Sequence, residues 1–270
     1  MSKRIKFIIK KILGPYYLYI VKKAFQKIFK TTGYYKELDL DERLFIFYSG
    51  FIKKGDLCFD IGANFGNRTN IFLKLGAKVV AVEPQVYCCR YLRMKFGAQI
   101  YIEQKAIGEV EDNRKLYISN WTGMSSLSSE WIEAVKKGRY SENIWYKTEI
   151  VDVITLDSLI SKYGMPAFIK IDVEGFEYEV LKGLNKDFNI ISFEYTLPEF
   201  KEKAINCLEH LRKLNSSIEF NYSVDERLKY ELNDWIGFEE IIRMINNDNF
   251  PNEAGDVYVR KIHLHNRYRA

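Results

Sequence analysis

The chain has 270 residues, 47% of them hydrophobic, which is enough to bury the core of one large α/β domain with an appendage. Its net charge of +5 arises from residues 1–30, which hold nine Lys or Arg and no acid; the remainder carries 32 basic and 36 acidic residues. A mildly acidic remainder excludes a broad nucleic-acid-binding surface, so we expect no nucleic-acid partner. The four cysteines contain no C-x-x-C pair, which favours a reducing compartment without disulfides.

Residues 1–35 are predicted to form a basic extension, separate from a domain over residues 36–270. Ile5, Ile8, Ile9 and Ile12 recur at helical spacing, as in a helix lying in a membrane surface. The apolar run 12–21 is too short to span a bilayer. We therefore expect a cytoplasmic protein with peripheral membrane contact through residues 1–30; a basic helix packed on the domain, or a tail, is the alternative.

A helix predicted over residues 36–54 precedes the first strand and turn, at 57–66. An apolar run ends at Asp60, and Gly62 and Gly66 enclose Asn64 before a helical pattern over 67–75. This predicts the first strand–turn–helix unit of a nucleotide-binding sheet. The pattern D-x-G-x-N-x-G lacks the G-x-G-x-x-G of a pyrophosphate site. It favours the amino-acid part of S-adenosylmethionine, with an ordinary glycine-containing turn as the alternative.

A second buried strand, 78–82, closes on Glu83 and Pro84, 23 positions after Asp60. An acid at this distance from a glycine turn accepts hydrogen bonds from the two ribose hydroxyls of a bound nucleoside. Strand ends often carry acids, so Glu83 by itself is a weak signal. Together with the first turn, it predicts an adenosine site.

The middle of the chain is less regular. A helix is predicted over 86–96 and a third strand over 98–105, followed by strands at 115–119 and 150–154. Between the last two lies a hydroxyl-rich loop, 121–128, which is either part of a site or a solvated linker. The aromatic residues of segment 130–146 either cap a substrate cleft or pack in the core.

Residues 168–184 read as a strand, an acidic corner containing Asp172 and Glu174, and an amphipathic helix. A capped helix over 155–162 precedes them. Strands at 190–195, 217–222 and 256–263 alternate with helices at 199–214 and 235–246. Strands followed by helices throughout predict a doubly wound α/β sandwich.

Three blocks in this order resemble the FkbM family of S-adenosylmethionine-dependent methyltransferases: 60–66, 82–84 and 169–175. The resemblance runs from about residue 55 to 195, with 255–258 similar to the closing strand. It implies the Rossmann-like class I methyltransferase sheet of about seven strands, the last antiparallel, in a methyltransferase domain over residues 36–270. It also implies S-adenosylmethionine as cofactor.

The resemblance and the strand-end pattern together give the predicted site. The predicted cofactor-binding residues are Asp60, Gly62, Ala63, Asn64, Gly66, Glu83, Pro84, Gln104, Ala106, Ser126 and Asp172. The predicted catalytic residues are Asp172, Glu174 and Glu194, one of which acts as base or helps to hold a divalent ion. The alternative for Asp172 is a structural acid that accepts hydrogen bonds from loop N–H groups, and for Glu174 an acid at a helix start that favours the helix dipole. No metal-ligand spacing supports an ion, and the pair His263 and His265 lacks a nearby carboxylate pattern.

The predicted function is methyl transfer to a hydroxyl of a sugar, glycan or natural-product acceptor, a substrate class that follows from the family resemblance. A non-catalytic adenosyl-binding or membrane-associated scaffold protein is one alternative. An NAD-dependent oxidoreductase is another, disfavoured by the missing G-x-G-x-x-G and by the lack of a Tyr-x-x-x-Lys dyad beside the site.

Overall fold

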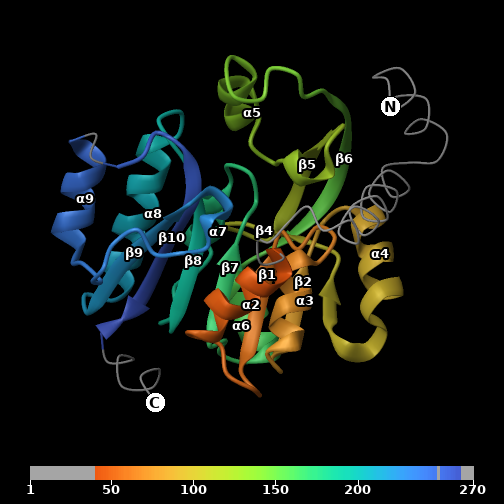
Figure 1. Cartoon of the computed structure of the whole chain (residues 1–270). Helices are drawn as coiled ribbons and strands as arrows, with labels where there is room; N and C mark the ends of the chain where they lie inside the picture. The colour runs from red at the N-terminus through yellow and green to blue at the C-terminus, as the bar shows by residue number, and fades with distance from the viewer. Residues whose placement is uncertain (1–39, 248–249, 263–270) are drawn as a thin grey trace, which may run out of the picture.

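The computed structural model describes residues 40–247 and 250–262 and places them around one seven-stranded sheet (Figure 1). The strand order is β3-β2-β1-β7-β8-β10-β9. The strands are β1 (Leu57–Ile61), β2 (Lys78–Val82), β3 (Tyr101–Glu103), β7 (Phe168–Ile171), β8 (Ile190–Thr196), β9 (Ile218–Val224) and β10 (Ala254–Lys261). All neighbours are parallel except β10, which runs antiparallel to both β8 and β9. The predicted sheet with a reversed last strand is confirmed.

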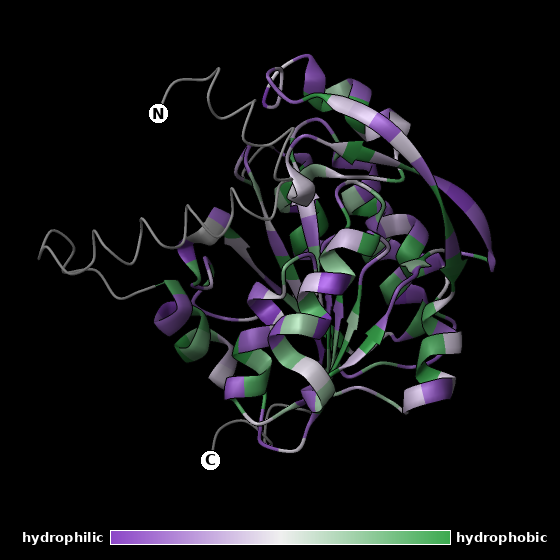
Figure 2. Ribbon diagram, turned by 90° about the vertical axis from the view of Figure 1, so that its right-hand side faces the viewer, coloured by the Kyte–Doolittle hydropathy of each residue, from purple (hydrophilic) through white to green (hydrophobic). Residues whose placement is uncertain are grey.

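Helices cover both faces of this sheet, giving three layers. One face packs against α2 (Leu40–Ser49), α3 (Asn67–Lys74) and α4 (Val86–Phe96). The other packs against α6 (Leu156–Tyr163), α7 (Glu177–Lys182), α8 (Lys201–Leu214) and α9 (Phe238–Asn246). Because both faces are covered, the central strands are apolar almost throughout, as the hydropathy colouring shows (Figure 2).

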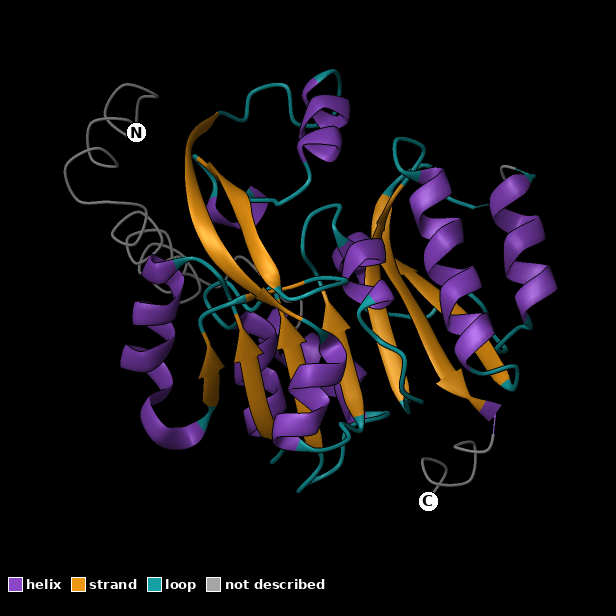
Figure 3. Ribbon diagram, turned by 180° about the vertical axis from the view of Figure 1, so that it is seen from behind, coloured by secondary structure: helices purple, strands orange, loops and turns teal. Residues whose placement is uncertain are grey.

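A second, three-stranded sheet stands over the carboxyl ends of the parallel strands (Figure 3). Its order is β4 (Ala106–Ile107), β6 (Trp145–Ile154), β5 (Asp112–Ser119), and α5 (Ser129–Lys136) lies in the β5–β6 connection. The sequence predicted strands at 115–119 and 150–154 but not that they form a separate sheet. We call β4, β5, β6 and the β5–β6 connection the arm.

Several element boundaries differ from the prediction. The third strand covers only Tyr101–Glu103, because β3 is an edge strand that pairs with three residues of β2 and Gly97–Gln99 forms a 3-10 turn. Helix α2 ends at Ser49, before Gly50, rather than at 54. The predicted cap of α6 is confirmed, since the Thr155 side chain accepts a hydrogen bond from the Ser158 N–H.

The predicted extension, residues 1–35, and the pair His263 and His265 lie outside the described residues. In the part of the chain that the structure describes, no helix has both the length and the apolar character needed to cross a membrane. The four cysteines, Cys58, Cys88, Cys89 and Cys207, are buried and free, in agreement with the predicted absence of disulfides.

Candidate active site

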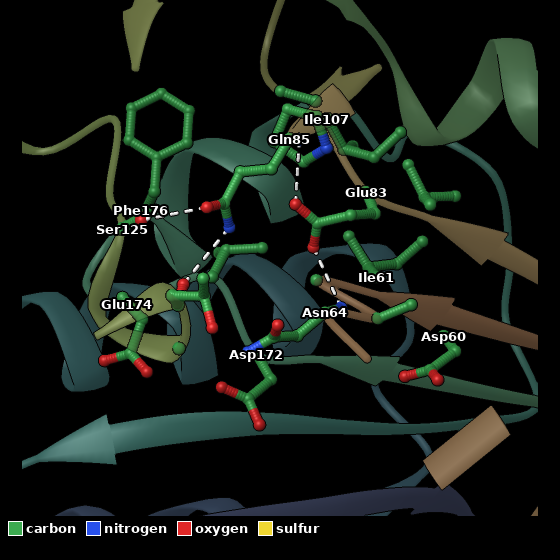
Figure 4. A pocket seen from close by; sticks show the side chains of 18 of the residues that line it. Asp60, Ile61, Asn64, Glu83, Gln85, Ile107, Ser125, Asp172, Glu174 and Phe176 are labelled. Carbon is green, nitrogen blue, oxygen red and sulfur yellow. Dashed lines mark hydrogen bonds between the residues drawn. The ribbon is translucent and has the colours of Figure 1, made fainter. Parts of the chain in front are cut away.

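A cavity opens where β1, β2 and β7 end, beneath the arm (Figure 4). Parallel strands place their carboxyl-terminal residues at one edge, which is where ligands bind in open α/β sheets. Nine of the predicted site residues line this cavity: Asp60, Gly62, Ala63, Asn64, Glu83, Pro84, Ala106, Asp172 and Glu174.

The turn after β1 brings two strand ends into close contact. Gly62 has φ +83°, and a Cβ atom on it would lie 1.8 Å from the Asp172 carbonyl oxygen. The Gly62 and Ala63 N–H groups both donate to the Val82 carbonyl oxygen, at 2.9 and 3.0 Å. Only glycine fits here, because the site needs both a left-handed backbone and the absence of a side chain.

Gly66, predicted in the cofactor site, does not line the cavity. It precedes α3 in the left-handed conformation, and a Cβ atom on it would lie 2.6 to 2.7 Å from side-chain atoms of Phe96 and Leu92. Its lack of a side chain therefore allows α3 and α4 to pack closely.

Glu83 presents a fixed carboxylate to the cavity. Its side chain accepts the Asn64 N–H at 2.9 Å on Oε2 and the Gln85 N–H at 2.8 Å on Oε1. The residue is 2% exposed, and this burial raises the pKa of the carboxyl to about 7 against the lowering effect of the two N–H donors. Each oxygen keeps a lone pair, so the carboxylate can accept two further hydrogen bonds from a ligand.

Gln85 is a cavity residue that sequence reasoning missed. Its Nε2 donates to the Thr122 carbonyl oxygen at 3.1 Å, and its Oε1 accepts from the Ser125 hydroxyl at 3.2 Å. One side chain thus ties the end of β2 to the 3-10 turn Thr122–Met124 of the arm (Figure 4). No local sequence pattern indicates this role, because the two groups that bond the Gln85 side chain lie 37 and 40 positions away.

Asp60 is almost completely buried at the end of β1, where its Oδ2 accepts the Thr69 hydroxyl at 2.5 Å. Burial raises the pKa of this carboxyl, whereas the hydrogen bond from Thr69 and the positive charges of Lys170 and Arg68 act in the opposite direction. Asp60 therefore joins the strand end to the first turn of α3.

The corner after β7 is held in an unusual conformation. Glu174 has φ +57° and Gly175 φ +85°. The Ser126 hydroxyl donates to the Glu174 carbonyl oxygen at 2.6 Å, and Glu177 Oε1 accepts the Val173 and Gly175 N–H groups at 3.1 and 3.2 Å. A left-handed conformation is costly for a residue other than glycine, so these bonds stabilise the position of Glu174.

Three acids meet at this corner. Oxygen atoms of Asp172, Glu174 and Glu194 all lie within 4.8 Å of one another. The pKa values of Glu174 and Glu194 are raised, first by burial and then by the neighbouring negative charges. Three carboxylates this close can share a proton or a divalent cation, but the group contains no His or Cys among the described residues.

Three further predicted residues do not line the cavity. Gln104 accepts a hydrogen bond from Arg93 at 3.2 Å, and its neighbours Lys105 and Ala106 line the cavity. Ser126 lies behind the wall, where it supports Glu174. Glu194 stands on β8 beside the acidic corner and lines a small neighbouring void.

The aromatic residues of 130–146 mostly belong to the core. Trp131, Tyr140 and Trp145 pack with Met124 and the apolar face of α5. Tyr146 is 59% exposed and is available to a ligand or to solvent.

The order of the seven strands and the reversed last strand define a class I methyltransferase fold, with a cavity where β1, β2 and β7 end. A model of the methyltransferase FkbM domain matches residues 60–245, more than half of the chain. The chain therefore belongs to the FkbM methyltransferase family, whose methyl donor is S-adenosylmethionine.

Solved structures similar to the chain include three methyltransferases of low identity. A TehB-like SAM-dependent methyltransferase from Corynebacterium glutamicum is 9% identical, with 89% of this chain and 97% of that chain covered and a TM-score of 0.45. Precorrin-6y C5,15-methyltransferase from Geobacter metallireducens is 9% identical, with 84% of this chain and 91% of that chain covered and a TM-score of 0.43. An rRNA methylase from Streptococcus thermophilus is 10% identical, with 84% of this chain and 99% of that chain covered and a TM-score of 0.42. With TM-scores below 0.5, these similarities carry no argument about this chain, and no curated protein matches it.

Proposed function

We propose that this methyltransferase transfers the methyl group of S-adenosylmethionine to a hydroxyl of a sugar, glycan or natural-product acceptor. The observation that carries the proposal is one cavity with a fixed carboxylate, Glu83, at one wall and an acidic corner, Asp172 and Glu174, at another. Such a cavity suits a ligand with ribose hydroxyls and a separate cationic group.

In this proposal Glu83 accepts the ribose hydroxyls, and the turn at Gly62 and Ala63 provides the floor for the amino-acid part of the cofactor. The apolar residues Ile107, Leu116 and Phe176 of the cavity wall offer a surface for the adenine ring. Asp172 faces the cationic part of the cofactor, since a carboxylate at the cavity wall attracts a nearby cation.

The cofactor supplies an already activated methyl group, so the protein's part is alignment and removal of one proton. Glu174 is the proposed base: it lines the cavity, and its raised pKa makes the ionised carboxylate a stronger proton acceptor than an ordinary glutamate. Glu194, beside it, is the proposed partner that shares this proton. A divalent cation held by the same acids would lower the pKa of the hydroxyl instead.

The proposed acceptor is a neutral, hydroxyl-rich molecule. An acidic corner disfavours an anionic group near the methyl, and suits a neutral polyol. The basic residues 1–30 would bring the protein to the inner face of a membrane, where a lipid-linked glycan could be the acceptor.

Calorimetric titration with S-adenosylhomocysteine, with NAD in parallel, tests the cofactor part. Micromolar binding of S-adenosylhomocysteine alone is expected. Binding of NAD alone, or of neither ligand, would contradict the proposal. A screen of neutral and phosphorylated sugars with radiolabelled donor then tests the acceptor class, and label found only in phosphorylated sugars would refute that part.

A further inference from the structure

Lys170 is a lysine in the interior of the sheet. It lies on β7 with 1% of its side chain exposed. Moving an ammonium group out of water is costly unless opposite charges surround it. A charged lysine in the interior, next to a ligand cavity, is therefore stable only if acidic partners lie close to it.

Those partners lie on two different strands. Lys170 Nζ is 2.7 Å from Asp256 Oδ1 on β10 and 3.3 Å from Asp172 Oδ2, just past the end of β7. Strand β8 runs between β7 and β10, and at this level it carries Ser192, which pairs with Lys170 on one side and Tyr258 on the other. The small Ser192 side chain leaves room for the long lysine to reach across β8.

The two carboxylates keep the ammonium charged. Burial acts to lower the pKa of Lys170, but the charges of Asp172 and Asp256 outweigh it, so that the pKa is well above its usual value. Of the groups on other elements, Tyr48 on α2 acts in the same direction and Arg68 on α3 opposes it. The charge of Lys170 in turn acts to lower the pKa of Asp60, Glu174 and Glu194.

Asp172 is more exposed than the other two charged residues of this cluster, Lys170 and Asp256. Its side chain is 36% exposed, against 12% for Asp256 and 1% for Lys170, and it lines the cavity. One carboxylate oxygen is thus bonded to a buried lysine while the side chain remains open to a ligand. The lysine, in turn, is anchored to the closing strand by Asp256.

We propose that Lys170 is a positioning residue for cofactor binding: it fixes the Asp172 carboxylate at the cavity wall and is itself anchored by Asp256 on β10. The inference rests on the proposed function, because it takes Asp172 as the acid that faces the cationic part of S-adenosylmethionine. It adds a residue that does not line the cavity and acts only through another side chain.

The direction in which cofactor affinity changes when Lys170 is replaced distinguishes a positioning role from a purely electrostatic effect on the ligand. Removing a positive charge near a site for a cationic ligand should tighten binding if Lys170 acts only through space. If Lys170 instead orients Asp172, its removal should weaken binding of the ligand. A merely structural role would lower the melting temperature and leave the affinity of the folded protein unchanged.

The experiment is titration of S-adenosylmethionine into the full chain as wild type, Lys170→Met, Asp172→Asn and the double variant. We expect each single variant to bind about tenfold more weakly, the loss of a charge-assisted contact. The double variant should bind no more weakly than Asp172→Asn alone, because Lys170 acts through Asp172. Lys203→Met on α8, which removes an ion pair with Glu179 on α7 and does not line the cavity, should bind like the wild type.

Unchanged or tighter binding by Lys170→Met, or losses that add in the double variant, would overturn the inference. If Lys170→Met does not fold, Lys170→Met with Asp256→Asn removes the unpaired buried acid as well. This variant should show the same loss, and wild-type affinity would overturn the inference. If the wild type itself binds neither S-adenosylmethionine nor S-adenosylhomocysteine, the proposed function fails instead.

Discussion

At the scale of single residues, the site depends on how backbone N–H groups orient a carboxylate. Glu83 is held by donors from two segments, the turn after β1 and the start of α4. Charge-assisted bonds of this kind are short and directional, so the carboxylate is in place before a ligand arrives. A fixed acceptor loses little entropy on binding.

Replacing Glu83 by Ala should weaken the binding of S-adenosylhomocysteine by about 1–3 kcal/mol, because two ribose hydroxyls lose a charged acceptor. Calorimetry on the purified variant measures this. Glu103→Ala is the matched control, since Glu103 also ends a strand but pairs with Lys162 and Tyr163 outside the cavity. Equal losses in the two variants would argue against a ribose contact at Glu83.

The pKa of Glu83, about 7, predicts a pH dependence of binding. A ribose hydroxyl donates to the ionised carboxylate, so affinity should rise as pH increases through 7 and level off above it. The affinity for S-adenosylhomocysteine at pH 6 should be up to about tenfold lower than at pH 8. Glu83→Gln should remove most of this dependence, and a wild-type affinity equal at both pH values would contradict the assignment.

At the scale of elements, two turns meet at the floor of the site. The turn after β1 contacts the corner after β7 so closely that Gly62 has no room for a side chain. The corner itself holds Glu174 in a left-handed conformation, with support from Ser126 of the arm and Glu177 of α7. Three elements therefore control the direction of one acid.

Gly62→Ala should abolish measurable binding of S-adenosylhomocysteine and destabilise the fold by about 2 kcal/mol or more, because the added Cβ meets the Asp172 carbonyl and the φ of +83° is strained. Binding and thermal unfolding should be measured together. Gly138→Ala is the control, since a Cβ there meets nothing within 4 Å and needs no left-handed backbone. A Gly62→Ala protein as stable as this control would show that the contact is not restrictive.

At the scale of the whole molecule, a doubly wound sheet places every strand-end acid at one edge, and the arm covers that edge. The Gln85 bonds to Thr122 and Ser125 link the arm to the main sheet. Charge is distributed at this scale too: the basic residues concentrate in 1–30, and the remainder is mildly acidic.

The predicted membrane contact is testable in the full chain. Replacing Lys3, Lys6, Lys10 and Lys11 by Gln should weaken binding to anionic vesicles by roughly 1 kcal/mol per lysine near the surface. Vesicle sedimentation measures it, with neutral vesicles as the comparison and S-adenosylhomocysteine binding as a check that the cavity is unaffected. If the variant sediments with anionic vesicles as the wild type does, these lysines do not make the contact.

The sequence by itself determined the fold class and the region of the site. Apolar runs ending in Asp60, Glu83 and Asp172 predict parallel strands, and parallel strands bring their carboxyl ends together, so these acids had to share an edge. The glycine turn was also recognisable in the sequence, although the contact with the Asp172 carbonyl that requires Gly62 comes from the tertiary structure.

Only the tertiary structure decided which side chains complete that edge. Gln85 and Lys170 take their roles from partners up to 40 and 86 positions away, and Gln104 turns to Arg93 instead of the cavity. The separate sheet of the arm arises in the same way, from pairing of β6 with both β4 and β5. Such contacts depend on how strands and helices pack, and neither local propensity nor periodicity contains that information.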